Sequence, residues 1–345
     1  MCTSPLKGFL NGLTENGKKN LIITPYTVDH IEFDSSGRKH YVNEPMHYFP
    51  DSLTEWIEIP CGQCVECRLN RSRQWADRCM LEAQYHKSNY FVTLTYDNAH
   101  IPKNEIIDSL TGEIAYNATL VKKDLSAFMK RLRRAYEYAG HDNNLRFYGC
   151  GEYGSTTLRP HFHVIIFGLE LDDLQLYKVN FNGDRLYTSD FLNKVWKNGF
   201  VVVGDVTWQS AAYTARYIMK KHLGKDSCFY EDYNIEPEFT LMSRRPGIAR
   251  DYYDDNKVKL FHDDFVSVPT HQGAKRIYPP RYFEKLFESD FPENDVLERK
   301  AKRQQAAIDN KNLILSKTSQ NYLDYLDTKC YNIENKLKCL VRPDL

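Results

Sequence analysis

Two histidines stand two positions apart in residues 159–168, a stretch typical of a buried β-strand. His161 and His163 lie in Arg-Pro-His-Phe-His-Val-Ile-Ile-Phe-Gly, where β-branched and aromatic residues run between a proline and a glycine. Side chains alternate faces along a strand, so both imidazoles point one way and Phe162 points the other way. Such a pair can bind a metal ion. The alternative is two histidines hydrogen-bonded or solvated at a strand edge.

A carboxylate completes this candidate metal site. Residues 145–152 predict a second strand, and the turn at 154–158 joins it to the histidine strand as a hairpin. The hairpin brings Glu152 close to His161 and His163. Two imidazoles and one carboxylate leave coordination positions open for substrate oxygens, which suits Mg²⁺ or Mn²⁺. An ion held in this way would polarise a phosphodiester.

Tyrosines and lysines follow at helical spacing in residues 209–223. Tyr213 and Tyr217 stand at i and i+4, so both phenols lie on one helix face, with Lys220 and Lys221 beyond them. A phenol is a weak nucleophile near neutral pH, but a metal ion and a lysine favour the phenolate. Its attack on DNA would leave a 5′-phosphotyrosyl bond and a free 3′-hydroxyl. The alternative is two aromatics packed on a sheet, with cations at a helix C-terminus.

Three cysteines have C-x₂-C-x₂-C spacing. Cys61, Cys64 and Cys67 form a candidate zinc site, with Cys79 or a more distant residue as the fourth ligand. The alternative is a tight, glycine-containing turn with partly buried thiols. The chain has nine cysteines, an odd number, so we expect a reducing cytoplasm rather than a disulfide framework.

Positive charge is concentrated in the centre of the chain. The net charge is zero, which argues against a polycation that coats nucleic acid, but residues 61–225 carry a modest excess of lysine and arginine. Such residues on a helix are ordinarily a solvated face. Those that could contact DNA phosphates lie on a predicted helix over 121–136 and in a Pro-Gly turn: Lys122, Lys123, Lys130, Arg131, Arg134, Arg244 and Arg245.

The pattern of elements predicts an α+β fold. The order β-α-β-β-α-β-α gives a small central antiparallel sheet with helices on one face, followed by a helical C-terminal region. We expect an N-terminal arm over residues 1–60, a central domain with a cysteine-rich entry segment over 61–250, and a mostly helical region over 251–345. No stretch has the length of a membrane span, and no secretory apolar core is present near the N-terminus.

Three stretches resemble, in order, the motifs of HUH-type rolling-circle replication initiators. They are Phe-Val-Thr-Leu-Thr-Tyr at 91–96, Arg-Pro-His-Phe-His-Val at 159–164 and Tyr-Thr-Ala-Arg-Tyr-Ile-Met-Lys-Lys at 213–221. Residues 60–68 and 242–248 are also similar to that group, in particular to the initiators of Microviridae, small single-stranded DNA phages, in their gokushovirus branch. The resemblance covers about residues 60–250. It implies an HUH endonuclease domain that nicks an origin and transfers the strand.

The resemblance also implies roles for individual residues. His161 and His163 match the metal-binding pair, Tyr213 and Tyr217 the two nucleophiles, and Lys220 or Lys221 the motif lysine. Glu152 as third ligand rests on the predicted hairpin alone.

The expected partner is the viral DNA origin, single-stranded or supercoiled, in the cytoplasm of a host bacterium. No G-x-x-x-x-G-K-[ST] motif occurs, so we expect a host helicase, and with it a host polymerase, to take part. One competing hypothesis is a plasmid or transposon nuclease with the same chemistry. Another is a non-catalytic nucleic-acid-binding protein whose sheet aromatics stack on bases. Substituting the histidines or tyrosines separates these, because a protein that only binds has no cutting to lose.

Overall fold

The computed structural model describes most of the chain. It covers residues 2–15, 19–44, 51–107, 111–180, 183–216, 221–222, 224–270 and 273–338. Contacts divide these residues into two compact units, a smaller one from residues 1–70 with 308–341 and a larger one from residues 71–307. Among the described helices, none combines the length and hydrophobicity that a membrane span needs.

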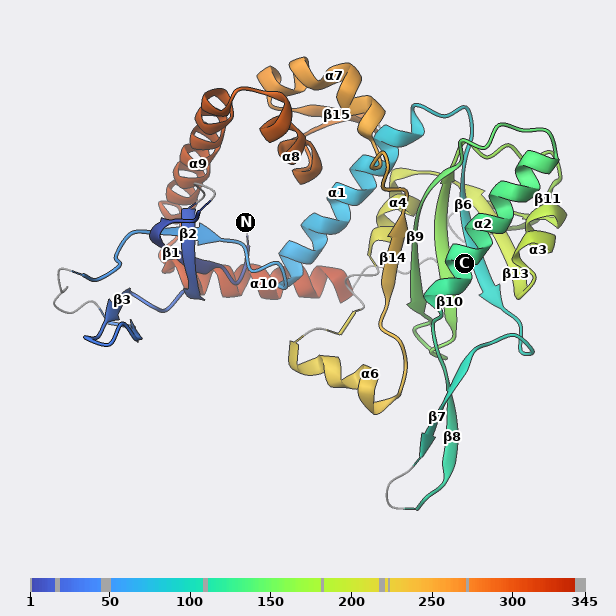
Figure 1. Cartoon of the computed structure of the whole chain (residues 1–345), viewed down its shortest axis with the longest axis horizontal. Helices are drawn as coiled ribbons and strands as arrows, with labels where there is room; N and C mark the ends of the chain where they lie inside the picture. The colour runs from blue at the N-terminus through green and yellow to red at the C-terminus, as the bar shows by residue number, and fades with distance from the viewer. Residues whose placement is uncertain are drawn as a thin grey trace. The chain divides into compact units, whose positions relative to one another are not determined.

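The larger unit is built on an antiparallel sheet of seven strands (Figure 1). In spatial order these are β11 (Leu174–Val179), β12 (Arg185–Ser189), β13 (Gly199–Asp205), β6 (Asn89–Tyr96), β10 (Pro160–Phe167), β9 (Arg146–Tyr153) and β14 (Phe239–Met242). The predicted antiparallel sheet and the β9–β10 hairpin are confirmed. The sheet is larger than expected because β11, β12 and β14 are short and lie towards its edges, where they lack the long apolar pattern of a central strand.

Two helices cover one face of this sheet. They are α2 (Lys122–Tyr138) and α3 (Asp190–Trp196), which pack against each other and, in the case of α3, against β13. Phe128 from α2 and Trp196 from α3 are fully buried on this face with Phe162 of β10. Phe162 therefore points away from its two histidine neighbours, as the strand pattern predicted.

Helices also cover the opposite face, which corrects the expectation of helices on one face only. α1 (Val65–Ala83) and α4 (Trp208–Ala215) bury small side chains there, such as Ala76, Cys79 and Ala211, against Phe91 and Ile165. Small residues let a helix approach a sheet closely, but they give a weak hydrophobic periodicity in the sequence. The predicted helix over 209–223 was therefore recognised, while its sheet face was not.

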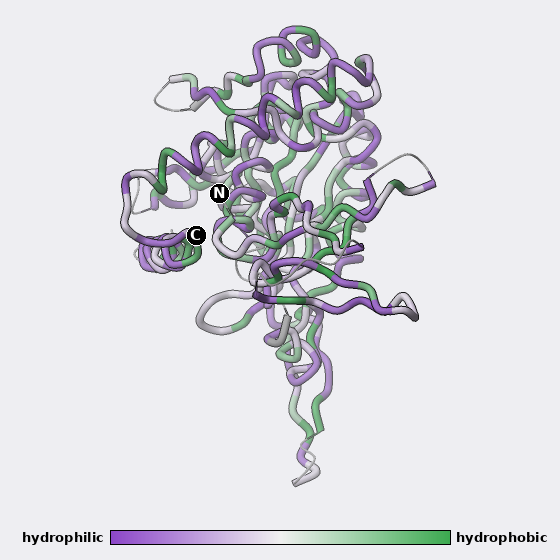
Figure 2. Tube along the Cα trace, turned by 90° about the vertical axis from the view of Figure 1, so that its left-hand side faces the viewer, coloured by the Kyte–Doolittle hydropathy of each residue, from purple (hydrophilic) through white to green (hydrophobic). Residues whose placement is uncertain are grey.

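The remaining elements of the larger unit surround this sheet. A hairpin of β7 (Lys103–Ile107) and β8 (Ile114–Ala118) extends away from it as a two-stranded arm in both views, with hydrophobic stretches along its strands (Figures 1 and 2). A second core, with Tyr253, Phe283 and Phe287, joins α7 (Arg250–Asp263), α8 (Arg281–Asp290), the start of α9 (Glu293–Leu315) and the hairpin β15 (Val266–Thr270)–β16 (Gly273–Ile277). The helical C-terminal region is thus confirmed, with one hairpin inside it.

The smaller unit contains a three-stranded sheet in the order β2 (Lys19–Pro25), β1 (Leu6–Leu13) and β5 (Trp56–Ile59). A hairpin of β3 (His30–Phe33) and β4 (Lys39–Val42) and the helix α10 (Tyr322–Lys338) belong to the same unit. Its buried core is small and centres on Phe9, Ile22, Val28 and Ile31.

Glu82 anchors α1 inside the larger unit. Its carboxylate is buried and accepts hydrogen bonds from Arg146 at the start of β9, from the Ala249 backbone N–H before α7, and from His86 at 3.1 Å. Burial by itself would raise the pKa of this carboxyl, but the hydrogen bonds outweigh burial and lower the pKa below its ordinary value of 4.5. A buried, ionised carboxylate thus connects α1, the sheet and α7.

Replacing Glu82 by Gln should destabilise the larger unit. Removing one partner of a buried ion pair costs about 3 kcal/mol, so we expect that loss in the free energy of unfolding at pH 7. The folded pKa is depressed, so the stabilisation is present above the unfolded pKa and is lost as pH falls through the folded pKa. Urea unfolding followed by circular dichroism should therefore show wild type and Glu82→Gln converging below pH 4.5. The exposed Glu113→Gln is the control, and an equal loss there would contradict this role.

Candidate metal and tyrosine site

Three neighbouring strands bring the predicted metal ligands to one face of the sheet. His163 of β10 lies opposite Thr93 of β6 and Cys150 of β9, while His161 lies opposite Thr95 and Glu152. Residues paired across antiparallel strands project on the same side, and i, i+2 neighbours share that side. His161, His163 and Glu152 therefore face the side of the sheet that α4 covers.

The three side chains converge on one point. Glu152 Oε1 lies 3.2 Å from His161 Nε2 and 3.3 Å from His163 Nε2. One ligand atom from each residue lies within 4.8 Å of the other two. The His163 and Glu152 side chains are 1% and 2% exposed, whereas His161 is 16% exposed. Solvent therefore reaches the group at His161.

The distal nitrogens of both imidazoles are held in place. His161 Nδ1 lies 3.1 Å from the Arg159 carbonyl oxygen, which can only accept, so Nδ1 carries a proton and the neutral ring keeps its Nε2 lone pair. His163 Nδ1 lies 3.0 Å from the Thr93 hydroxyl, and its ring stacks on Phe91 with a centroid distance of 5.4 Å. Metal-binding histidines commonly have such partners on the second nitrogen, because these fix the tautomer and the ring orientation.

Glu152 is ionised in this environment. Burial by itself would raise the pKa of its carboxyl, but the hydrogen bonds and charges of His161 and His163 hold that pKa well below the usual value. The group therefore offers an anionic oxygen and two imidazole nitrogens. That donor set fits a divalent cation with open coordination positions, so the residues present suit such an ion.

Tyr213 reaches the same point from α4. The helix begins with a capping box, in which Thr207 and Ser210 exchange side-chain and backbone hydrogen bonds. The Tyr213 hydroxyl donates to Glu152 Oε1 at 3.3 Å, and its ring lies edge-on to His163 with a centroid distance of 5.0 Å. Tyr213 is partly exposed. A half-exposed phenol thus contacts the carboxylate that both histidines share.

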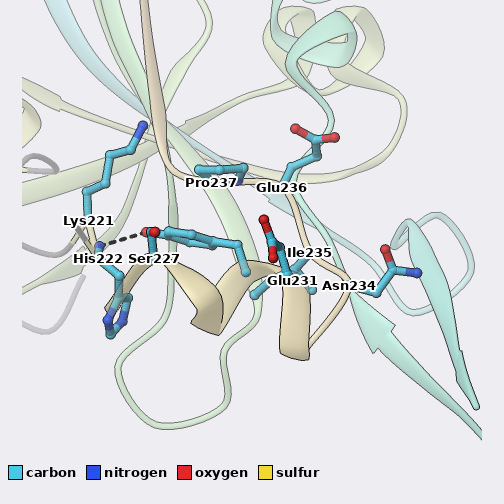
Figure 3. A pocket seen from close by; sticks show the side chains of 9 residues that line it. Lys221, His222, Ser227, Glu231, Asn234, Ile235, Glu236 and Pro237 are labelled. Atoms are coloured by element: carbon cyan, nitrogen blue, oxygen red, sulfur yellow. Dashed lines mark hydrogen bonds between the residues drawn. The ribbon is translucent and has the colours of Figure 1, made fainter. Parts of the chain in front are cut away.

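The other residues of the predicted tyrosine helix lie elsewhere. α4 ends at Ala215, and Tyr217 and Lys220 lie outside the described residues. Lys221 Nζ donates to the Glu238 carbonyl oxygen at 3.3 Å. Its side chain borders a hollow of about 470 Å³ beside α6 (Cys228–Asp232), which includes His222, Ser227 and Glu231 (Figure 3).

The basic residues of α2 lie on the sheet face opposite this site. Lys122, Lys123, Lys130 and Arg134 are exposed, whereas Arg131 donates to the carbonyl oxygens of Val195 and Trp196 at 2.8 and 3.0 Å. These bonds satisfy the C-terminal carbonyls of α3, so Arg131 has a structural role. Arg244 and Arg245 are exposed beyond β14, next to the end of β9 that is distant from Glu152.

The cysteine triad gains a fourth member in the smaller unit. Cys61, Cys64 and Cys67 gather with Cys2, and the four sulfurs lie within 4.8 Å of one another. Cys79, one of the fourth ligands considered, is instead fully buried in the core between α1 and the sheet. A distant residue supplies the fourth sulfur.

Sequence reasoning missed three residues next to the metal and tyrosine site. Thr93 holds His163, as described above. Burial lowers the pKa of the Arg216 guanidinium and neighbouring Tyr213 raises it, so Arg216 lies close enough for the two charges to interact. Phe200 of β13 pairs with Thr95, is 40% exposed, and has its ring centroid 5.4 Å from that of exposed Tyr177. Only Thr93 lay within a recognised motif, and its role depends on strand register.

Comparisons with known proteins point in one direction. Residues 89–222 match the family model of the replication-associated protein ORF2. The chain is 33% identical over 313 residues to the replication-associated protein ORF2 of Spiroplasma virus 4, which covers 88% of this chain and 92% of that protein. It is 32% identical over 240 residues to the replication-associated protein VP4 of Bdellovibrio phage phiMH2K, covering 68% and 69%. No solved structure matches.

The placement of Arg131 can be tested directly. Hydrogen bonds to a charged group contribute about 2 kcal/mol, so Arg131→Ala should lower the free energy of unfolding by roughly that amount. Arg134→Ala, on the exposed side of the same helix, should change it by less than about 0.5 kcal/mol. Urea unfolding measures both. If Arg131 instead bound a phosphate, its loss would reduce the salt dependence of DNA binding, seen by fluorescence anisotropy, without destabilising the fold.

Proposed function

The chain belongs to the family of phage replication-associated proteins, and from this premise we propose that it nicks the origin strand of phage DNA to start rolling-circle replication. Tyr213 is the nucleophile in this proposal, and Glu152, His161 and His163 hold a divalent metal ion beside it. The supporting observation is the hydrogen bond from the Tyr213 hydroxyl to Glu152, the carboxylate shared by both histidines.

The reaction exchanges one phosphate ester for another. The Tyr213 oxygen attacks phosphorus and forms a new P–O bond, while the bond from phosphorus to the 3′ oxygen breaks. The phenol proton passes to water at the half-exposed hydroxyl, and the 3′ oxygen takes up a proton to become a 3′-hydroxyl. The 5′-phosphotyrosyl bond keeps the ester for a later attack by a 3′-hydroxyl, which rejoins the strand.

The side chains around Tyr213 prepare its oxygen for this attack. A divalent ion bound by Glu152, His161 and His163, Mg²⁺ or Mn²⁺, supplies positive charge beside the non-bridging phosphate oxygens. The His163 ring and the Glu152 carboxylate fix the position of the phenol. The Arg216 guanidinium favours the phenolate over the phenol because a nearby cation stabilises the charged form.

The sheet offers single-stranded DNA a route to this point. His161, Thr95 and Phe200 stand in one row across β10, β6 and β13, and Phe200 continues to Tyr177, which is 54% exposed. Bases of a single strand stack on exposed aromatic rings with about 1–3 kcal/mol each. In our proposal Phe200 and Tyr177 hold bases beside the scissile phosphate.

The remaining expectations stay predictions. Tyr217 would serve as a second nucleophile, and Lys220 or Lys221 as a cation at the reacting phosphate. Host helicase and polymerase would extend the free 3′-hydroxyl, since the chain carries no P-loop motif.

Substituting Tyr213 should remove the covalent intermediate. We expect Tyr213→Phe to lower the rate of nicking of supercoiled DNA with the cognate phage origin by about three orders of magnitude, as loss of a nucleophile does elsewhere. Denaturing gels would detect protein attached to the 5′ end. The control is Tyr138→Phe, which removes an exposed phenol on α2 and should nick normally. A Tyr213→Phe/Tyr217→Phe double variant tests whether any residual cutting comes from Tyr217. A wild type that binds this DNA but never cuts it, with any metal, would favour the non-catalytic binding protein.

Substituting Glu152 should weaken metal binding. We expect Glu152→Gln to raise the Kd for Mn²⁺ at this site by about 100-fold or more, and Thr93→Val, which leaves the ligands intact, by about tenfold. Electron paramagnetic resonance of free Mn²⁺ measures both. Glu238→Gln is the matched control, because Glu238 is also buried in the larger unit but has no histidine pair beside it. Equal Mn²⁺ affinity in Glu152→Gln and wild type would exclude this ligand set.

A further inference from the structure

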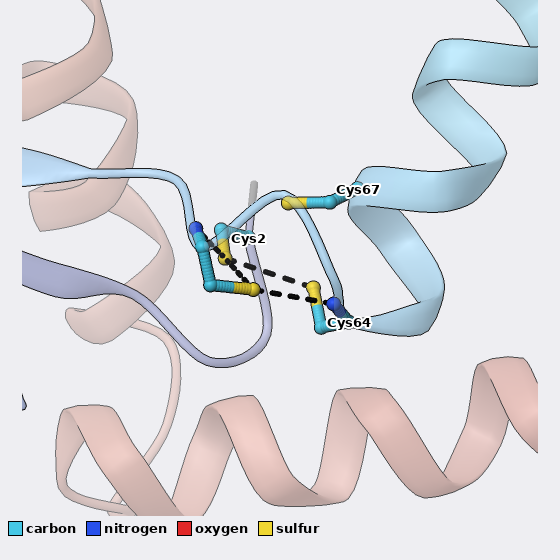
Figure 4. A group of neighbouring side chains, drawn as sticks. Cys2, Cys64 and Cys67 are labelled. Atoms are coloured by element: carbon cyan, nitrogen blue, oxygen red, sulfur yellow. Dashed lines mark hydrogen bonds between the residues drawn. The ribbon is translucent and has the colours of Figure 1, made fainter. Parts of the chain in front are cut away.

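Four cysteine sulfurs converge from three separate segments of the smaller unit. Cys2 precedes β1, Cys61 and Cys64 lie in the turn between β5 and α1, and Cys67 lies in the first turn of α1. The Cys2 Sγ atom is 3.6 Å from both Cys61 Sγ and Cys64 Sγ, and all four sulfurs lie within 4.8 Å of one another (Figure 4). Their side chains point towards a common centre.

The spacing of the sulfurs fits a single tetrahedral ion. Zinc–sulfur bonds of about 2.3 Å in a tetrahedron place sulfurs about 3.8 Å apart. An iron–sulfur cluster holds its cysteine sulfurs farther apart, because several iron and sulfide ions lie between them. The observed group therefore has the dimensions of one ion with four thiolate ligands.

The backbone of the turn directs N–H groups at these sulfurs. The Gln63 and Cys64 amides donate to Cys61 Sγ at 3.4 and 3.2 Å, and the Cys61 amide donates to Cys2 Sγ at 3.4 Å. Gly62 has φ +75°, a conformation that L side chains rarely adopt, and it permits this tight turn. N–H donors favour the thiolate, which is the form that binds a metal. This arrangement is independent of the cysteine spacing in the sequence and also indicates a bound cation.

We propose that Cys2, Cys61, Cys64 and Cys67 bind one zinc ion that stabilises the smaller unit. Four protein ligands fill a tetrahedral coordination sphere, so the site is structural and leaves no position for substrate. The unit needs such a cross-link because its buried core is small, and small cores rarely suffice alone. The ion fastens the start of the chain to the first turn of α1.

The first test is the metal content of the full-length protein purified under reducing conditions. Inductively coupled plasma mass spectrometry should find one zinc per chain, and Cys2→Ser should lose it. Two cysteine variants serve as controls and should keep one zinc: Cys330→Ser, on α10 of the same unit but outside the group, and Cys79→Ala, in the core of the larger unit. Zinc retained in Cys2→Ser, zinc lost in Cys79→Ala, or iron in place of zinc would overturn the proposal.

A second test does not depend on a variant that folds. Co²⁺ added to the metal-free wild-type protein should give the intense absorption of a tetrahedral four-thiolate site, and Cys2→His should shift those bands while keeping the site tetrahedral. Zinc, but not Mg²⁺ or Mn²⁺, should restore the melting temperature of metal-free protein. Unchanged melting on zinc removal, or Co²⁺ bands identical in Cys2→His, would overturn the assignment. None of these readouts depends on DNA cutting, so the proposed nicking activity stands or fails separately.

Discussion

The buried carboxylate of Glu152 is the constraint on which the catalytic face depends. Taking a carboxylate out of water costs several kcal/mol unless charged or hydrogen-bonding partners surround it. Here the partners are two imidazoles and a phenol, and they come from β10 and α4. A one-residue slip of β9 against β10 would turn Glu152 to the opposite face. The site therefore exists in one register only, and the rest of the larger unit can be understood as what holds that register.

Packing on the other face of the sheet secures the same strands. Trp196 fills the space under Phe162, and its indole N–H donates to the Thr95 carbonyl oxygen at 2.9 Å, on the strand beside His161. Gly199 allows β13 to approach, since a Cβ there would lie 2.2 Å from the same carbonyl oxygen. These contacts fix β6 from below and from its neighbour. Arg131 holds the end of α3, and so contributes to the site without touching it.

What could be predicted from the sequence was local. The i, i+2 spacing of His161 and His163 and the short hairpin to Glu152 involve few residues, so their shared face follows from strand geometry. The face of the sheet that a helix covers is not encoded locally. The cations of α2 were recognised, yet their position opposite the histidines depends on the crossover path of the chain. Cys2 was missed for the same reason, because it meets Cys61 across 59 positions of sequence.

The two candidate metal sites differ in the property that decides which ion each can use. Four thiolates are soft ligands that enclose an ion completely, which favours zinc and excludes substrate. Two imidazoles and one carboxylate would also bind zinc tightly, because affinity for divalent ions rises towards the end of the first transition series. Affinity alone therefore cannot reserve the Glu152 site for Mg²⁺ or Mn²⁺. Its open positions can, because a hard phosphate oxygen completes the coordination of a hard ion, so DNA itself would help to select the ion.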